Sequence, residues 1–214
     1  MNVAVIGAGN MGSAFARRLS ASGHEVAITS KGMESARKVA AETGPNVRAV
    51  PTNRVAEGAD IIIAATPAGE QVNAVRSIGG TAGRVVVDIA NPLTSDFLGL
   101  TVGHITSFAE ELAKQLPGAK VVKAFNTVFA QVLAEGGDFG GRRIQVFFAG
   151  DEDEAKEKVR ALIESCGFEA VDAGPLQNAR YLEPLGGLNI WFGYVAGRGA
   201  QILPVWLSRQ GPAT

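Results

Sequence analysis

The sequence contains very few of the residues that form disulfides and metal sites. Its 214 residues include one cysteine, Cys166, and two histidines, His24 and His104. A single cysteine excludes an intramolecular disulfide and is typical of a reducing compartment, so we expect a cytoplasmic location. One cysteine and two histidines are also too few for a zinc site of the usual four-ligand kind, and we expect no metal.

The sequence also lacks an excess of charge of either sign. Twenty Lys and Arg residues stand against 21 Asp and Glu residues, which gives a formal net charge of −1. Without a basic excess we expect no nucleic-acid partner, and without a Lys/Arg-rich helix we expect no membrane surface. The acidic run at residues 151–154 precedes lysines and an arginine, so it is better explained as acids at a helix N-terminus than as a metal site.

No apolar stretch has the character of a membrane span. The longest, residues 184–207, is interrupted by Arg198, a proline and several glycines, which rarely occur together in a bilayer-spanning helix. We expect it to be a buried or subunit-contacting helix, with Trp191, Phe192 and Tyr194 in core or dimer contacts rather than on a planar ligand. The opening residues, MNVAVIGAG, lack the basic leader of a secretory signal.

Short apolar strands alternate with helical patterns along the whole chain. Strands are expected at residues 2–6, 24–30, 47–50, 60–66, 84–90, 120–125, 144–149 and 168–171. The runs DIIIAAT and RVVVDIA are almost continuously apolar, which is typical of parallel strands buried on both faces. The alternation predicts an α/β fold with a doubly wound, mainly parallel sheet in residues 1–175. We expect residues 176–214 to form a short C-terminal helical part.

Residues 7–12, GAGNMG, form the motif G-x-G-x-x-G between an expected strand and an expected helix. In that context Gly7 makes the tight turn, Gly9 lets a pyrophosphate approach the backbone, and Gly12 allows the helix to pack closely on the strand. The free N–H groups at the helix N-terminus, around Asn10 and Met11, favour an anion. The motif therefore predicts a Rossmann-type sheet that binds a dinucleotide.

A cation stands at the end of the second strand, where NAD-binding proteins typically have an acid. Residues 26–32 read VAITSKG. An Asp or Glu here would accept hydrogen bonds from the ribose hydroxyls of NAD but would repel the 2′-phosphate of NADP. Thr29 and Ser30 offer hydroxyl groups and Lys31 offers a positive charge, a set that suits a phosphate. We expect NADP(H), with the alternative that Lys31 is a solvated loop lysine.

The sequence shows no clear acid or base for proton transfer to a carbonyl or imine. His104 lies in a loop without a visible partner, which is more typical of a structural or surface histidine. Lys123, near the end of its strand, is equally consistent with a substrate contact and with an ion pair. Hydride transfer from a nicotinamide to a flavin or deazaflavin needs mainly the positioning of two flat rings. The missing acid or base favours that class of reaction.

Taken together, several segments resemble the NADPH-dependent reductase family that includes the coenzyme F-420:NADP oxidoreductases and the cytoplasmic reductase domain of the STEAP metalloreductases. The resemblance covers nearly the whole chain. It is carried by GAGNMG (7–12), HEVAITSK (24–31), Ala65-Thr66-Pro67, VVVDIANP (85–92), VVKAFNT (121–127) and DAGPLQNARYLEPL (172–185). The last segment is the most specific, and KAFNT looks more like the STEAP branch.

The resemblance implies how the cofactor and acceptor are held. NADPH would lie along the glycine turn, with Ser30 and Lys31 on its 2′-phosphate. Ala65, Thr66 and Pro67 would lie near its ribose and nicotinamide end. The residues implied at the nicotinamide and acceptor pocket are Asn91 and Pro92 on the cofactor side and Phe125, Asn126 and Thr127 on the acceptor side. The C-terminal helical part would complete the acceptor site, in a homodimer.

We therefore predict an NADPH-dependent oxidoreductase that transfers hydride between NADP(H) and a flavin-type acceptor: FMN, FAD or the deazaflavin coenzyme F-420. No residue is predicted to be catalytic. One alternative is a small imine or carbonyl reductase with His104 or Lys123 as proton donor, and another is a non-catalytic NADP-binding module. The expected partners are a small-molecule redox acceptor and a second copy of the chain, because the apolar C-terminal part exceeds what a small domain covers.

Overall fold

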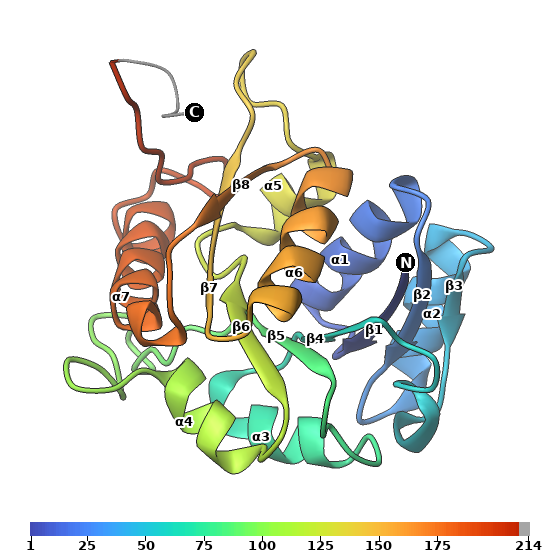
Figure 1. The fold of residues 1–214 in the computed structure, drawn as a ribbon. Coiled ribbons are helices and arrows are strands. Elements are labelled where there is room, and N and C mark those ends of the chain that lie inside the picture. The colour runs from blue at the N-terminus through green and yellow to red at the C-terminus, as the bar shows by residue number, and fades with distance from the viewer. Residues whose placement is uncertain (210–214) are drawn as a thin grey trace.

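An eight-stranded sheet forms the centre of the computed structural model, which describes residues 1–209 (Figure 1). The strands are β1 (Asn2–Ile6), β2 (Glu25–Thr29), β3 (Val47–Ala49), β4 (Ile61–Ala64), β5 (Val85–Asp88), β6 (Lys120–Ala124), β7 (Gln145–Gly150) and β8 (Glu169–Asp172). The helices are α1 (Asn10–Ala21), α2 (Met33–Thr43), α3 (Ala68–Arg76), α4 (Phe108–Gln115), α5 (Ala130–Glu135), α6 (Asp153–Ser165) and α7 (Ala179–Ile190). Shorter helical turns are η1 (Thr52–Arg54), η2 (Leu176–Asn178) and the π-helical η3 (Trp191–Val195).

The sheet is mainly parallel and doubly wound, as predicted. Its strand order is β3-β2-β1-β4-β5-β6-β7-β8. Strands β1 to β6 run parallel, whereas β7 pairs antiparallel with β6, and β8 runs parallel to β7. The chain moves outward from β1 to β3 on one side and then from β4 onward on the other. The carboxyl ends of β1 and β4 therefore meet at a switch point, where α/β proteins bind ligands.

Side chains alternate across the central strands and build two hydrophobic layers. On β1, Val3 and Val5 belong to the layer under α1, α2, α5 and α6, whereas Ala4 and Ile6 belong to the layer that includes α3 and α4. Ile61 and Ile62 divide in the same way on β4. Burying each such branched side chain stabilises the fold by about 1.5–3 kcal/mol. Both faces of β1 and β4 are thus covered, and their carboxyl ends are left for the site.

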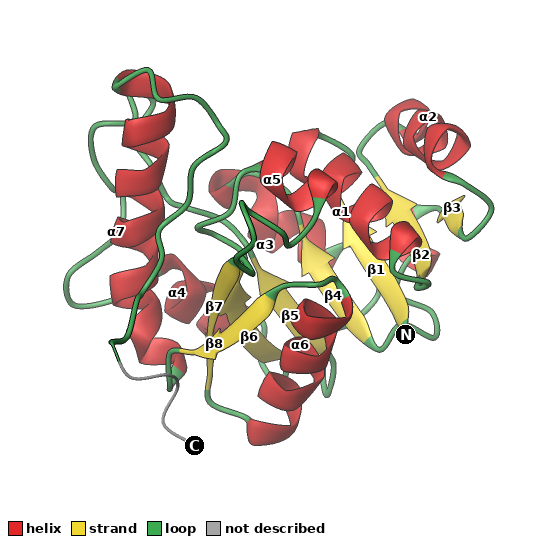
Figure 2. Ribbon diagram, turned by 90° about the horizontal axis from the view of Figure 1, so that it is seen from above, coloured by secondary structure: helices red, strands yellow, loops and turns green. Residues whose placement is uncertain are grey.

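The C-terminal part lies at the β8 end of the molecule, opposite α2 (Figure 2). Helix α7 packs on β7, where Leu182 shares a hydrophobic cluster with Phe147. Helical structure ends with η3 at Val195, earlier than the sequence pattern predicts. Gly197 and Gly199 follow with φ angles of 70° and 79°, a left-handed conformation that ends helices. Residues 196–209 contain no helix, and residues 210–214 lie outside the described part.

Residues 1–209 contain no helix that is both long enough and apolar enough to cross a membrane. The range contains no group of three or more His, Cys, Asp or Glu side chains that could hold a metal ion. Cys166 is buried and unpaired. Asp153 and Glu154 occupy the first turn of α6, so the acidic run does lie at a helix N-terminus as predicted.

Candidate functional site

The turn between β1 and α1 leaves room only for glycine at two of its positions. Gly7 has a φ of 110°, and a Cβ atom there would lie 2.4 Å from the carbonyl oxygen of Ala65. A Cβ atom on Gly12 would lie 1.9 Å from the carbonyl oxygen of Gly7. Beside Gly9, in contrast, no heavy atom lies within 4 Å of the Cβ position. The space next to Gly9 is therefore open to a ligand and is not filled by the protein.

Gly9 is also the N-cap of α1, and no side chain caps this end of the helix. The backbone N–H groups of Asn10, Met11 and Gly12 in the first turn have no partner within the helix. Together with the helix dipole they favour an anion. The glycine motif thus presents a pyrophosphate-sized group with both space and hydrogen-bond donors.

A cleft along the carboxyl ends of β1 and β4 consists of two joined cavities. The β2 cavity has a volume of about 710 Å³ and includes the end of β2 and one side of α3. The β6 cavity has a volume of about 410 Å³ and lies at the ends of β5 and β6 beside α7. The two share Gly9, Ala65, Thr66 and Pro67. This arrangement matches the shape of a dinucleotide, in which a pyrophosphate joins two nucleosides.

The end of β2 supplies the polar lining of the β2 cavity. Thr29 is buried, and its Oγ1 lies 3.0 Å from Oγ1 of Thr52. The Ser30 hydroxyl donates to one backbone carbonyl and accepts from one backbone N–H at the start of α2. Lys31 is exposed and forms no ion pair within residues 1–209. Of the three residues, Lys31 is thus the one whose side chain is not already engaged.

Hydrogen bonds from asparagine side chains fix the loops at the base of the β6 cavity. Asn91 Nδ2 donates to the carbonyl oxygen of Asn126 at 2.7 Å. Asn126 Nδ2 donates to Oδ1 of Asn91 at 2.9 Å and to the carbonyl oxygen of Leu182 at 2.7 Å. Asn189 Nδ2 donates to the carbonyl oxygen of Thr127 at 3.1 Å. These bonds tie the loops after β5 and β6 to α7.

Two buried oxygen atoms of residues that line this cavity have no hydrogen-bond partner in the described part of the chain. They are Oγ1 of Thr66 and Oδ1 of Asn126. An unsatisfied buried polar atom costs about 1–3 kcal/mol. A bound group with donors, such as the carboxamide of a nicotinamide, would satisfy such atoms. The residues present therefore fit a nicotinamide in the β6 cavity.

Phe125 and Pro92, both expected at the nicotinamide and acceptor pocket, are placed differently from the other residues expected there. Phe125 lines the β6 cavity, but the residue is 1% exposed, and its ring packs edge-on against Phe15 and Phe168 at centroid distances of 5.1 and 6.3 Å. Its φ of 60° is rare for a bulky residue and marks a sharp turn of the chain after β6. Pro92 lines neither cavity, and its carbonyl oxygen accepts two hydrogen bonds from Thr101.

Lys123 belongs to a buried ion-pair network and lines neither cavity. Its Nζ lies 2.9 Å from Oδ2 of Asp88 and 3.0 Å from Oε1 of Glu183. Glu183, in α7, also accepts the backbone N–H groups of Phe108 and Ala109 at 2.9 and 3.0 Å. The network joins β5, β6, α4 and α7. Of the two alternatives for Lys123, the ion pair is thus confirmed.

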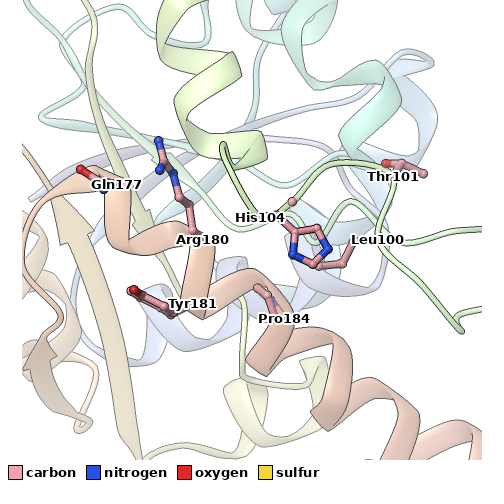
Figure 3. Close-up of a pocket in the computed structure, with 8 residues that line it drawn as sticks. Leu100, Thr101, His104, Gln177, Arg180, Tyr181 and Pro184 are labelled. Atoms are coloured by element: carbon pink, nitrogen blue, oxygen red, sulfur yellow. The ribbon is translucent and has the colours of Figure 1, made fainter.

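His104 lines a third cavity, of about 680 Å³, between the loop after β5 and α7 (Figure 3). In the same cavity Arg180 points away from His104 and forms two hydrogen bonds, of 2.9 and 2.7 Å, with Glu110. This guanidinium holds the pKa of the Glu110 carboxyl below its ordinary value. No residue that lines this cavity lines the β6 cavity. His104 therefore does not lie where a proton donor to a substrate in the β6 cavity would have to be.

The structure adds residues to the β6 cavity that sequence patterns did not identify. They include Leu93, Val128, Phe129, Gln131, Asn189, Ile190 and Tyr194. Tyr194 is the only titratable side chain in the described lining. Residues 189–194 are separated from the glycine motif at residues 7–12 by almost the whole length of the chain. No local sequence pattern therefore connects the two segments.

Comparisons with known proteins identify a family and several related structures. Residues 2–92 match the family model described as NADP oxidoreductase, coenzyme F-420-dependent. A putative F-420-dependent NADP reductase from Arthrobacter sp. FB24 is 30% identical, with a TM-score of 0.81 over 93% of this chain and 96% of that chain. A hypothetical protein from Sinorhizobium meliloti is 34% identical, with a TM-score of 0.77 over 84% of this chain and 88% of that chain.

Two further relatives cover less of their own length or are more distant. The metalloreductase STEAP3 of Rattus norvegicus is 33% identical over 184 residues, which is 86% of this chain but only 36% of that relative. An imine reductase from Streptomyces aurantiacus is 18% identical, with a TM-score of 0.66 over 92% of this chain and 64% of that chain, and shows a shared fold alone. The chain belongs to the NADP oxidoreductase, coenzyme F-420-dependent, family, a family of NADP-dependent oxidoreductases.

Proposed function

We propose that the protein transfers hydride between NADP(H) and a flavin-type acceptor: FMN, FAD or the deazaflavin coenzyme F-420. The lining of the β6 cavity carries this proposal. Among the described residues it contains no carboxylate, imidazole, thiol, lysine or arginine, and one tyrosine, Tyr194. Reduction of a carbonyl or imine needs a proton donor at the substrate oxygen or nitrogen. Hydride transfer between two flat cofactors needs chiefly their positioning.

In this proposal NADP(H) lies along the cleft with its adenosine at the end of β2 and its nicotinamide at the ends of β5 and β6. Its pyrophosphate would lie beside Gly9 at the N-terminus of α1. Its adenosine and 2′-phosphate would occupy the β2 cavity, where Lys31 supplies a free positive charge. Its nicotinamide would occupy the β6 cavity, where Thr66 and Asn126 have oxygen atoms without a partner. In this proposal residues 1–175 hold the cofactor.

The acceptor would occupy the remainder of the β6 cavity. The C-terminal part, residues 176–209, contributes Asn189, Ile190 and Tyr194 to that lining, so it would complete the acceptor site. In the forward direction the hydride would pass from the nicotinamide ring to the acceptor ring, which would leave NADP⁺. The reduced acceptor would take up one proton from solvent. A small imine or carbonyl reductase would instead have to use Tyr194 as its proton donor.

The direct test is anaerobic oxidation of NADPH, followed by absorbance, with FMN, FAD and coenzyme F-420 offered separately. Turnover with one of them is expected and identifies the acceptor. Tight NADPH binding without turnover of any of the three contradicts the proposal. That result would favour the non-catalytic NADP-binding module, or a reductase of small imines or carbonyls.

A second test concerns the 2′-phosphate. Lys31→Glu should weaken NADPH binding by about 10- to 100-fold, because it replaces a charge-assisted contact of about 1.5–3 kcal/mol with a repulsion. NADH binding should change little. Lys38→Glu is the matched control, since Lys38 is an exposed lysine of α2 that does not line the β2 cavity. An equal effect of both variants, measured by calorimetric titration, would refute the role of Lys31.

We also propose that the protein forms a homodimer through an apolar stripe on α7. The stripe consists of Tyr181, Leu188, Trp191 and Val195, next to Phe97 and Leu98 of the loop after β5. Three of its helical members repeat every seven residues, and Figure 2 shows α7 at one end of the molecule. A self-complementary apolar face of this kind suits a two-fold contact. Sedimentation should show Leu188→Glu as a monomer and Leu207→Glu, an exposed control outside the stripe, as a dimer.

A further inference from the structure

The chain changes from α-helix to π-helix at the end of α7, beside the β6 cavity. The backbone N–H of Ala196 donates to the carbonyl oxygen of Trp191 at 2.9 Å, a bond that spans five residues. Tyr194 lies within the π-helical η3, whereas Asn189 lies in the last turn of α7, and both line the β6 cavity. The i→i+5 bond adds a residue to the helical turn, so the π turn sets the direction of Tyr194 relative to α7.

Contacts beneath the π turn hold Tyr194 in place. The ring of Phe129 packs edge-on against the ring of Tyr194, with 5.3 Å between centroids and 80° between planes. A Cβ atom on Gly193 would lie 2.6 Å from Cζ of Phe129, so only glycine lets that ring approach the turn. Asn189 ties the preceding turn of α7 to the carbonyl oxygen of Thr127. The position of Tyr194 is thus determined by the same loops that form the cavity floor.

Tyr194 differs from the other aromatic residues of this cavity. Phe125 and Phe129 are 1% and 6% exposed, whereas Tyr194 is 58% exposed. An ordered, largely exposed ring at an apolar cavity is a surface that a bound aromatic group can cover. The other residues of the described lining are aliphatic, amide, hydroxyl or glycine residues. Tyr194 is therefore the side chain with a ring available to a ligand.

We propose that Tyr194 is a specificity-determining residue that packs its ring against the flat ring system of the hydride acceptor. The contact selects aromatic, multi-ring acceptors over small aliphatic imines and ketones, which offer no surface for the tyrosine ring. This inference rests on the proposed function and names the part of the site that recognises the acceptor. The ring, rather than the hydroxyl, makes the contact, because the lining needs no proton donor for hydride transfer between cofactors.

The test compares three variants with the wild type under anaerobic conditions at saturating NADPH. FMN, FAD and coenzyme F-420 are each varied separately, and binding of FMN in the presence of NADP⁺ is measured at equilibrium. Tyr194→Ala should raise the acceptor KM and the FMN dissociation constant about tenfold, with NADPH affinity unchanged. Tyr194→Phe should restore both. Phe139→Ala is the matched control, because Phe139 is an exposed aromatic residue that lines neither cavity of the cleft and lies outside the apolar stripe on α7.

Each outcome separates this inference from the proposed function. Turnover by the wild type with an unchanged KM in Tyr194→Ala overturns the inference and leaves the proposed function intact. Loss of kcat in Tyr194→Phe as large as in Tyr194→Ala makes the hydroxyl a proton donor and also overturns it. Binding of FMN that depends on Tyr194, without turnover, supports the inference but contradicts the proposed function. Absence of both binding and turnover with all three acceptors overturns both.

Discussion

Removal of the Lys123 side chain should destabilise the protein far more than removal of any exposed lysine. The Nζ atom of Lys123 is fully buried and lies 2.9 Å from Asp88 and 3.0 Å from Glu183, whose side chains are 0% and 1% exposed. Lys123→Met would leave two buried carboxylates without their common cation. Breaking one buried pair in this way costs about 3–5 kcal/mol.

The remaining hydrogen bonds keep the expected cost of Lys123→Met within that range. Asp88 still accepts Gln71 Nε2 at 2.8 Å and the backbone N–H of Ala90 at 2.9 Å. Glu183 still accepts the two N–H groups at the start of α4. For a chain of this length 1 kcal/mol shifts the Tm by about 2–4 °C. The Tm should therefore fall by about 6–20 °C in a thermal melt.

Lys120→Met is the matched control for this experiment. Lys120 lies in the same strand, and its ion pair with Glu154 is 3.0 Å long, with side chains 29% and 68% exposed. Such a surface pair contributes about 0–1 kcal/mol. If both variants unfold at the same temperature, the buried network does not stabilise the fold as argued. Below its Tm, Lys123→Met should still bind NADPH, because Lys123 lines neither cavity.

Two further predictions concern the glycine turn and pH. Gly12→Ala should destabilise the fold by about 1–3 kcal/mol, because its Cβ would meet the carbonyl oxygen of Gly7 at 1.9 Å. Gly9→Ala should leave the Tm within a few degrees of wild type yet weaken NADPH binding at least about tenfold, as the new methyl group occupies the pyrophosphate position. Equal effects on Tm and affinity in the two variants would contradict this. Burial, then the nearby N-terminal ammonium, lowers the pKa of His24 below its ordinary value of 6.5. Stability to urea should therefore fall as the pH drops below about 6.5, since the unfolded chain takes up a proton there that the folded protein does not. The wild type should lose more stability between pH 7.5 and 5.5 than His24→Gln, and identical losses would exclude His24 as the cause.

Much of the fold could be predicted because its signals are local. The apolar runs at residues 60–66 and 84–90 predict strands buried on both faces, and β4 and β5 are such strands. Gly7 and Gly12 could be identified from spacing, since a tight strand–helix turn leaves room for no side chain. The short helix α5 and the antiparallel direction of β7 were not anticipated. An alternating apolar strand has the same pattern in either direction, so pairing with β6 decides it.

What the sequence by itself determined is therefore the series of strands and helices, the glycine turn and the basic residue at the end of β2. Each depends on residues within a few positions of one another, where backbone geometry leaves little choice. Only the tertiary structure decided that Lys123 pairs with Glu183, 60 residues away, and that Tyr194 lines the β6 cavity. Such contacts form when packing brings distant segments together, and a π turn that reorients one side chain depends on what packs beneath it. The glycine turn and the end of β2 could thus be located from local patterns, whereas the part of the β6 cavity formed by α7 and η3 required the folded chain.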